Sequence, residues 1–133
     1  MKRTTILTLV VLLLLSIAMP TVARERKERG ARLQFSCASH DFGTVSRRGN
    51  DLVCEFEFEN SGDEPLVVLS VTTSCSCLKA ECSRKPVSPG ERGVVRIMLE
   101  ANKVERGVFH RVIQVRSNSI EGDNILTVQG RAE

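Results

Sequence analysis

Residues 51–60 read DLVCEFEFEN, and from Cys54 onward the side chains alternate between apolar and acidic. Cys54, Phe56 and Phe58 share one parity, and the glutamates that follow each of them share the other. Because successive side chains of a β-strand point to opposite faces, this alternation predicts a strand with one face in a core and one in water. The segment therefore indicates a half-buried β-sheet.

The same two-residue period recurs along the chain. Turn-forming stretches such as SGDEP at 61–65 and PVSPGERG at 86–93 separate the periodic segments. Helical spacing is missing after the first 23 residues, and short strands at regular intervals predict an all-β antiparallel sandwich of about seven strands. Besides 51–60, the predicted strands lie within 32–37, 40–45, 66–73, 94–101, 107–118 and 124–130.

Three positions carry more specific predictions. The segment LVVLSVTT at 66–73 begins with apolar residues at both parities, which is typical of a central strand covered on both faces. Gly43, in HDFGTV, predicts a turn or bulge, with Phe42 beside it in the core. His110 is expected at a solvent-facing strand position.

The N-terminus has the order of a secretory signal peptide. Lys2 and Arg3 precede an apolar run from Ile6 to Met19, and small residues around Ala23 suit cleavage after it. The run is shorter than the roughly 20 residues of a bilayer-spanning helix, so an uncleaved anchor is the weaker interpretation. We therefore predict a signal peptide at 1–23, a flexible arm at 24–32 and one sandwich domain at 33–133, in a periplasmic or secreted protein without stable membrane insertion.

Charge and aromatic content argue against a nucleic-acid partner. The chain has 19 basic and 16 acidic residues, mixed along its length, and it has neither Trp nor Tyr. Nucleic-acid readers usually combine a basic stripe with stacking aromatic side chains. Neither feature is present in this sequence.

A set of motifs, in order, resembles a bacterial family of unknown function that is related to ASH and major-sperm-protein domains. The resemblance covers roughly residues 33–131 and implies an immunoglobulin-like sandwich, usually exported, without established enzymatic activity and suspected of protein-interaction roles. The family motif Ser-Cys-Gly-Cys maps onto 74–77, where Ser76 replaces the glycine. The motifs are HDFGTV (40–45), EFEFENSGDEPLVV (55–68), SCSC (74–77), PVSPGERGVV (86–95) and VRSNS (115–119).

Five cysteines in an exported domain suggest disulfides. Cys37 and Cys54 share parity with neighbouring core positions, and we expect them to face the interior and to pair. Cys75 and Cys77, if extended, would hold their side chains about 6.6 Å apart, too far for a direct bond unless the chain turns sharply. Cys82 is then the expected partner of Cys77, or of Cys75, and one thiol of the cluster is left over.

Two other uses of the cysteine loop stay open. Three thiolates could hold a soft ion, Cu(I) or Zn(II), although C-x-C-x4-C is not a standard zinc spacing. Thiol–disulfide exchange would require a lowered thiol pKa, which nearby basic residues could favour. The candidate ligands are Cys75, Cys77, Cys82, His40, His110 and Met98, and the basic neighbours are Lys79, Arg84 and Lys85.

No nucleophile elbow, phosphate-binding loop or paired-carboxylate site is apparent in the sequence. We therefore expect a non-enzymatic binding or structural module without a cofactor. Contact with a protein partner is expected through an exposed edge strand or the loops at one end of the sandwich.

Overall fold

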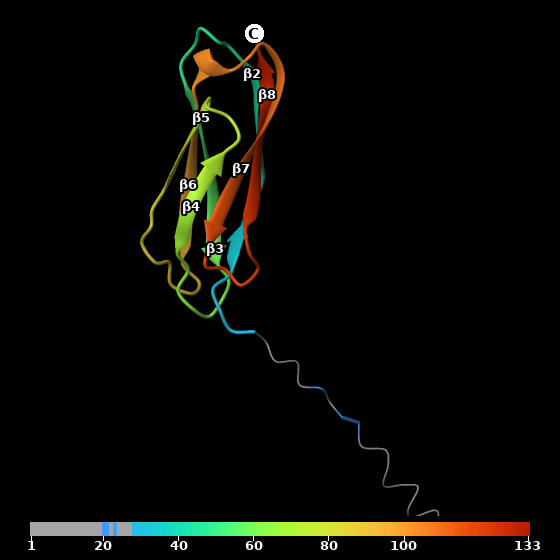
Figure 1. Ribbon diagram of the computed structural model, residues 1–133, viewed down its shortest axis with the longest axis vertical. Helices are drawn as coiled ribbons and strands as arrows, with labels where there is room; N and C mark the ends of the chain where they lie inside the picture. The colour runs from blue at the N-terminus through green and yellow to red at the C-terminus, as the bar shows by residue number, and fades with distance from the viewer. Residues whose placement is uncertain (1–19, 22, 24–27) are drawn as a thin grey trace, which may run out of the picture.

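The computed structural model describes residues 20, 21, 23 and 28–133. In this part of the chain eight strands form two four-stranded sheets, which face each other in an elongated sandwich (Figure 1). The all-β sandwich prediction is confirmed, with one strand more than expected. The strands are β1 (Leu33–Phe35), β2 (Ser39–Val45), β3 (Leu52–Asn60), β4 (Val68–Thr73), β5 (Leu78–Cys82), β6 (Arg92–Leu99), β7 (Gly107–Ser117) and β8 (Asn124–Ala132), with a 3-10 turn η2 (Ala101–Lys103) after β6.

The first sheet has the strand order β1-β3-β6-β5, and the second sheet has the order β2-β8-β7-β4. The predicted signal peptide, apart from residues 20, 21 and 23, and residues 24–27 of the predicted arm fall outside the described residues. Within 20, 21, 23 and 28–133, no helix is long and apolar enough to cross a membrane.

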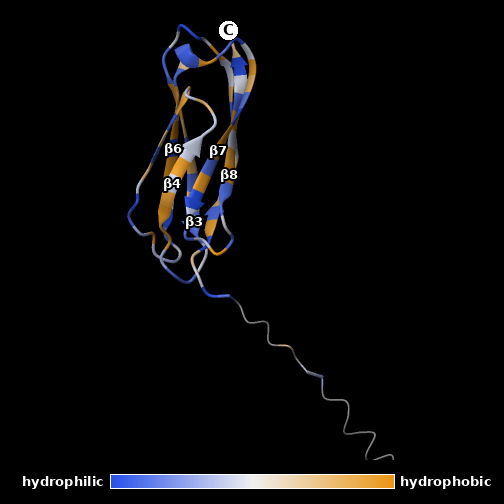
Figure 2. Cartoon of the chain, in the orientation of Figure 1, coloured by the Kyte–Doolittle hydropathy of each residue, from blue (hydrophilic) through white to orange (hydrophobic). Residues whose placement is uncertain are grey.

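The core lies between the sheets and consists of the inward positions of the long strands. On β3, Cys54, Phe56 and Phe58 are buried as predicted, while the intervening glutamates face outward. The alternation is visible as changing colour along the strands in Figure 2. The other buried strand positions include Val95, Ile97 and Leu99 of β6, Phe109, Ile113 and Val115 of β7, and Leu126 and Val128 of β8.

One strand pair is parallel, which corrects the prediction of a purely antiparallel sandwich. After β1, the chain crosses to the other sheet within residues 36–38 and continues as β2, alongside β8 and in the same direction. A bulge interrupts β2 between Asp41 and Thr44, where Gly43 has a φ of 69° and donates its N–H to Asp41 Oδ1 at 2.7 Å. The bulge expected at Gly43 is therefore confirmed, and Phe42 packs partly buried against the core.

The strand β4 lies at the edge of the second sheet, so the prediction of a central strand in this segment is wrong. Its register shifts between Val68 and Ser70, and Leu69 points outward with 53% of its surface exposed. The run of apolar residues thus reflects an irregular edge rather than two covered faces.

The last residue of β3 is Asn60, a buried polar residue whose side chain makes four hydrogen bonds. Its Oδ1 accepts the N–H groups of Arg32 and Gly62, at 3.2 and 3.0 Å. Its Nδ2 donates to the carbonyls of Glu64 and Val87, at 2.7 and 2.9 Å. One amide side chain therefore ties together three segments that are distant in sequence.

Ordered contacts begin at Gly30, three residues before the expected start of the domain. Gly30 exchanges hydrogen bonds with Asp63 through its N–H and its carbonyl, and Ala31 accepts one from Ile120 N–H. Both Gly30 and Ala31 are buried, so the last residues of the predicted arm belong to the sandwich.

Candidate functional site

The cysteine loop connects β4 to β5 and is a tight turn. Cys75 and Cys77 form a disulfide with a Cα–Cα distance of 5.2 Å. The turn is closed by a hydrogen bond from Leu78 N–H to the Cys75 carbonyl, and the Cys77 carbonyl accepts the Glu100 N–H at 2.7 Å. Cys77 is fully buried, so the loop is anchored to the sandwich and does not project freely.

This pairing corrects the expectation that the two neighbouring cysteines stay apart. The expectation assumed an extended chain, whereas the turn brings the two Cα atoms closer than an extended dipeptide repeat allows. Cys82, the expected partner, is a free thiol at the far end of β5. Five residues of strand place it about 16 Å along the chain from Cys77, which is too far for a disulfide.

The expected pair of Cys37 and Cys54 is also not formed. Cys54 is buried on β3, but Cys37 lies after the end of β1, in the crossover to β2, and is exposed. Its Sγ contacts the Ser39 carbonyl at 3.0 Å. The parity that places Phe35 toward the core therefore does not extend to Cys37.

The free thiols within the sheets are poorly suited to exchange chemistry. Burial raises the pKa of the Cys54 thiol to about 11 and also raises the pKa of Cys82. The basic residues Lys79, Arg84 and Lys85, which could favour a thiolate in the cysteine loop, do not lower the pKa of Cys82, because burial raises it. Cys75 and Cys77 are joined to each other.

The structure does not bring the candidate metal ligands together. His40 is on β2 with its ring against Phe42, at a centroid distance of 4.7 Å. His110 lies on the solvent face of β7, as predicted, and Met98 lies on the outer side of β6, in the other sheet. Among the described residues no cluster of three His, Cys, Asp or Glu side chains is suited to holding an ion.

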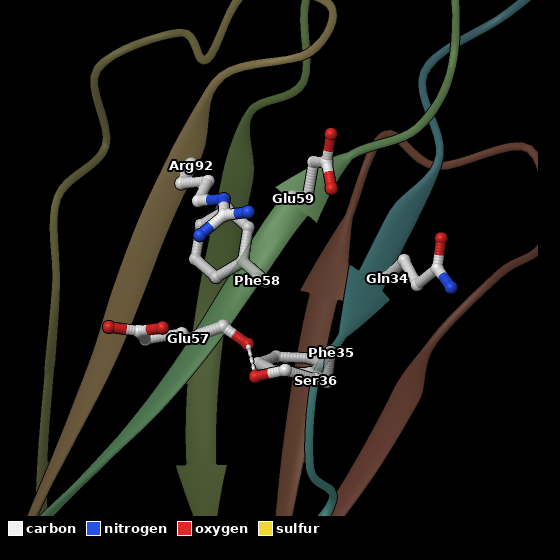
Figure 3. Close-up of a pocket in the computed structure, with 7 residues that line it drawn as sticks. All are labelled: Gln34, Phe35, Ser36, Glu57, Phe58, Glu59 and Arg92. Carbon is white, nitrogen blue, oxygen red and sulfur yellow. Dashed lines mark hydrogen bonds between the residues drawn. The ribbon is translucent and has the colours of Figure 1, made fainter.

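Shallow hollows occur on both sheets. One of about 220 Å³ lies where β1 meets β3, and its lining residues come from β1, β3 and β6 and from Ser36 after β1 (Figure 3). Ser36 Oγ donates to the Glu57 carbonyl at 3.2 Å. Another, of about 340 Å³, lies over the β2 bulge and includes His110, Gln129 and Arg131. Each is a depression between surface side chains, which suits contact with a partner surface better than enclosure of a small ligand.

The outer faces of the two sheets differ in chemistry. The first sheet presents mostly charged side chains, while the second sheet exposes aliphatic ones among neutral polar ones. Val108 is 80% exposed, Ile125 is 51% exposed, and Val112 lies between them on the same face. The outward charges of the first sheet are Glu55, Glu57, Glu59, Lys79, Glu81, Arg92 and Arg96, and those of the second sheet strands are Asp41, Arg116 and Arg131.

The strand β3 is paired along only part of one edge. One edge of β3 pairs with β6 from Leu52 to Glu59. The opposite edge pairs with β1 only from Phe58 to Asn60. Within the described residues, no strand pairs with this side of β3 between Leu52 and Phe56. This stretch and the aliphatic outer face of the second sheet were not identified from the sequence.

Comparison with solved structures identifies the sandwich as immunoglobulin-like, of the ASH/PapD-like type. It is similar to ASH/PapD-like domain 7 of human CEP192, with a TM-score of 0.66 and 12% identity over 87% of this chain and 95% of that one. It is also similar to the YadV chaperone, with a TM-score of 0.55 and 11% identity over 76% of this chain and 52% of that one. At these identities the likeness shows the fold.

A protein of unknown function from Porphyromonas gingivalis W83 has a TM-score of 0.66 and 22% identity, over 77% of this chain and 47% of that one. This chain therefore spans about half of that relative's length. A search of curated proteins finds no match. The family model of DUF1573, a protein family of unknown function, matches residues 33–132. The chain therefore belongs to the DUF1573 family, and the expectation of a family of unknown function is confirmed.

Proposed function

We propose that this chain is an exported, non-enzymatic module that binds another protein through the outer face of its second sheet. The observation that carries the proposal is the exposure of Val108, Val112 and Ile125 on that face, together with Leu69 at its β4 edge. Val112 and Ile125 are diagonal neighbours on β7 and β8. Exposed aliphatic side chains that lie next to each other commonly mark interaction surfaces.

The neighbouring residues on that face support a protein partner. Thr127 lies opposite Val112, and Gln114 lies opposite Ile125, so these two aliphatic side chains have neutral polar neighbours on the next strand, whereas Val108 lies opposite Arg131 at the end of the patch. An apolar patch among uncharged polar groups can be covered by a protein surface without stranding a buried charge. The structural neighbours include a chaperone and an ASH/PapD-like domain, which are compatible with this role.

Export is supported by the order of charged, apolar and small residues at 1–23. The compartment is tested by fractionating producing cells and sequencing the N-terminus of the protein. A mature chain beginning near Arg24 in the periplasmic or secreted fraction is the expected result. A full-length chain in the cytosol would contradict the proposal of export.

Binding is tested by the native mass of the protein in that fraction. We expect an assembly heavier than the single chain. Replacing both Val112 and Ile125 by Glu should return the protein to the mass of the single chain. Binding by this variant would require burying two carboxylates in the interface, which is unfavourable. The matched control is Val94→Glu, since Val94 is comparably exposed on the first sheet. A single-chain mass for the unmodified protein would refute the proposed function.

A further inference from the structure

The four edge strands of the sandwich are not equally open to a new strand. A bulge interrupts β2 and another interrupts β4. The strand β1 has three residues, and β5 has five and lies beside β4. Short, bulged or covered edges resist the addition of another strand. The uncovered stretch of β3 from Leu52 to Phe56, which we call the β3 open edge, is also short, but it has no bulge and no strand of the described residues beside it.

The backbone groups that point out of this edge follow from the neighbouring hydrogen bonds. The Glu57 carbonyl accepts from Ser36 N–H on the β1 side, while Asn60 N–H donates to the Glu91 carbonyl on the β6 side. Odd-numbered residues of β3 therefore direct their backbone groups toward the β1 side. The N–H and carbonyl groups of Val53 and Glu55 consequently face the open edge, and no described residue bonds them.

The side chains beside the open edge define what could be added there. On the outer face, Val53 is 43% exposed and Glu55 and Glu57 follow it. Arg96 of β6 lies opposite Glu55, but no Lys or Arg of the described chain forms an ion pair with either carboxylate, and Glu57 lies opposite Val94. On the inner face, Leu52 is only partly buried against the core, and Cys54 and Phe56 are buried. An added strand would meet carboxylates on one face and apolar side chains on the other.

A second copy of this chain is a poor occupant. Pairing the open edges of two copies would place their Glu55 and Glu57 rows side by side, and like charges across neighbouring strands are destabilising. A segment with Lys or Arg on its outward positions would instead neutralise both carboxylates.

We infer that the β3 open edge binds an extended segment of a partner protein in which apolar and basic residues alternate. The segment adds to the first sheet beyond the end of β1, exchanges backbone hydrogen bonds with Val53 and Glu55, and places its basic residues beside Glu55 and Glu57. This surface is separate from the second-sheet face of the proposed function. The inference rests on that function only in requiring a protein partner.

Amide hydrogen exchange of the 15N-labelled protein tests the inference, with an eight-residue peptide of alternating Lys and Val as the probe. In the free protein, the amides of Val53 and Glu55 should exchange much faster than those of Cys54 and Phe56, which face β6. The peptide should slow exchange at Val53 and Glu55 at least tenfold, and a peptide with Glu in place of every Lys should not.

Variants test the charge preference. Glu55→Gln should weaken binding of the Lys–Val peptide severalfold, and Glu55→Lys should weaken it at least tenfold and allow the Glu–Val peptide to bind. Glu81→Lys is the matched control, because Glu81 also lies on the outer face of the first sheet, two strands away. Absence of protection, protection at β4 or β5 instead, or equal binding by the Glu55 variants would overturn the inference. If any of these results is obtained while the native mass still exceeds that of a single chain, only this inference is refuted and the proposed binding through the second sheet is retained.

Discussion

Replacing Asn60 by Ala should remove a large part of the stability of this domain. The change deletes four side-chain hydrogen bonds, to Arg32, Gly62, Glu64 and Val87, at a fully buried position. Each hydrogen bond contributes about 1 kcal/mol net, and leaving a buried partner unpaired costs at least as much. Loss of four such bonds should therefore lower the free energy of unfolding by about 4 kcal/mol. Domains of this kind are stable by only about 5–15 kcal/mol.

The assay is urea unfolding followed by far-UV circular dichroism, because the chain has no Trp or Tyr for fluorescence. Asn118→Ala is the matched control. Asn118 also bridges two backbone groups, Val67 N–H and the Pro65 carbonyl, at 2.7 and 3.0 Å, but it is exposed, so water can replace both bonds. Its loss should cost about 1 kcal/mol. A cost for Asn60→Ala no larger than that of the control would refute the role assigned to Asn60.

Further predictions concern the cysteines. The disulfide of Cys75 and Cys77 closes a ring of three residues, so reducing it should lower the free energy of unfolding by only about 1.6 kcal/mol in a chain-entropy estimate; unfolding on reduction, seen by circular dichroism, would contradict this. At pH 8, iodoacetamide should modify Cys37 in the folded protein and Cys54 only after denaturation, and mass spectrometry that finds both modified at equal rates would show the burial to be wrong. The folded state raises the pKa of Cys54 from 9.0 to about 11, so it holds the proton more tightly than the unfolded state. The free energy of unfolding should therefore fall as pH rises from 9 to 11, and a Cys54→Val variant should lose this part of the pH dependence.

Much of the fold follows from local alternation. The period of two in DLVCEFEFEN predicts the burial of Cys54, Phe56 and Phe58, because one face of a regular strand must contact the core. The same parity reaches Asn60, the last residue of the predicted strand 51–60. An Asn on the inward side of a strand is itself a signal of a buried polar anchor, so this residue could have been identified from the sequence.

The cysteine pairing could not be predicted in the same way. It depends on whether residues 74–77 are extended or turned, and the turn is fixed by contacts from elsewhere, including the bond between the Cys77 carbonyl and Glu100 N–H. Likewise, the position of Cys37 depends on where β1 ends. Sequence parity holds only within a strand, and the crossover to the second sheet breaks it.

The open edge of β3 and the parallel partner of β8 share one cause. The chain leaves the first sheet after Phe35 and joins the second sheet at Ser39. That switch leaves part of β3 uncovered and brings β2 alongside β8. Alternation shows which face of a strand is buried but does not show which strand lies next to it, so neither feature could be read from the pattern.

Site-specific photo-crosslinking in producing cells tests the central claim most directly. A photoreactive side chain at Val112 would report on the outer face of the second sheet, and the same group at Glu81 would report on the outer face of the first sheet. We expect one discrete protein adduct when the group is at Val112, no such adduct when it is at Glu81, and loss of the Val112 adduct in an Ile125→Glu variant. No discrete adduct from Val112, or an equal one from Glu81, would show that the second-sheet face is not the binding surface.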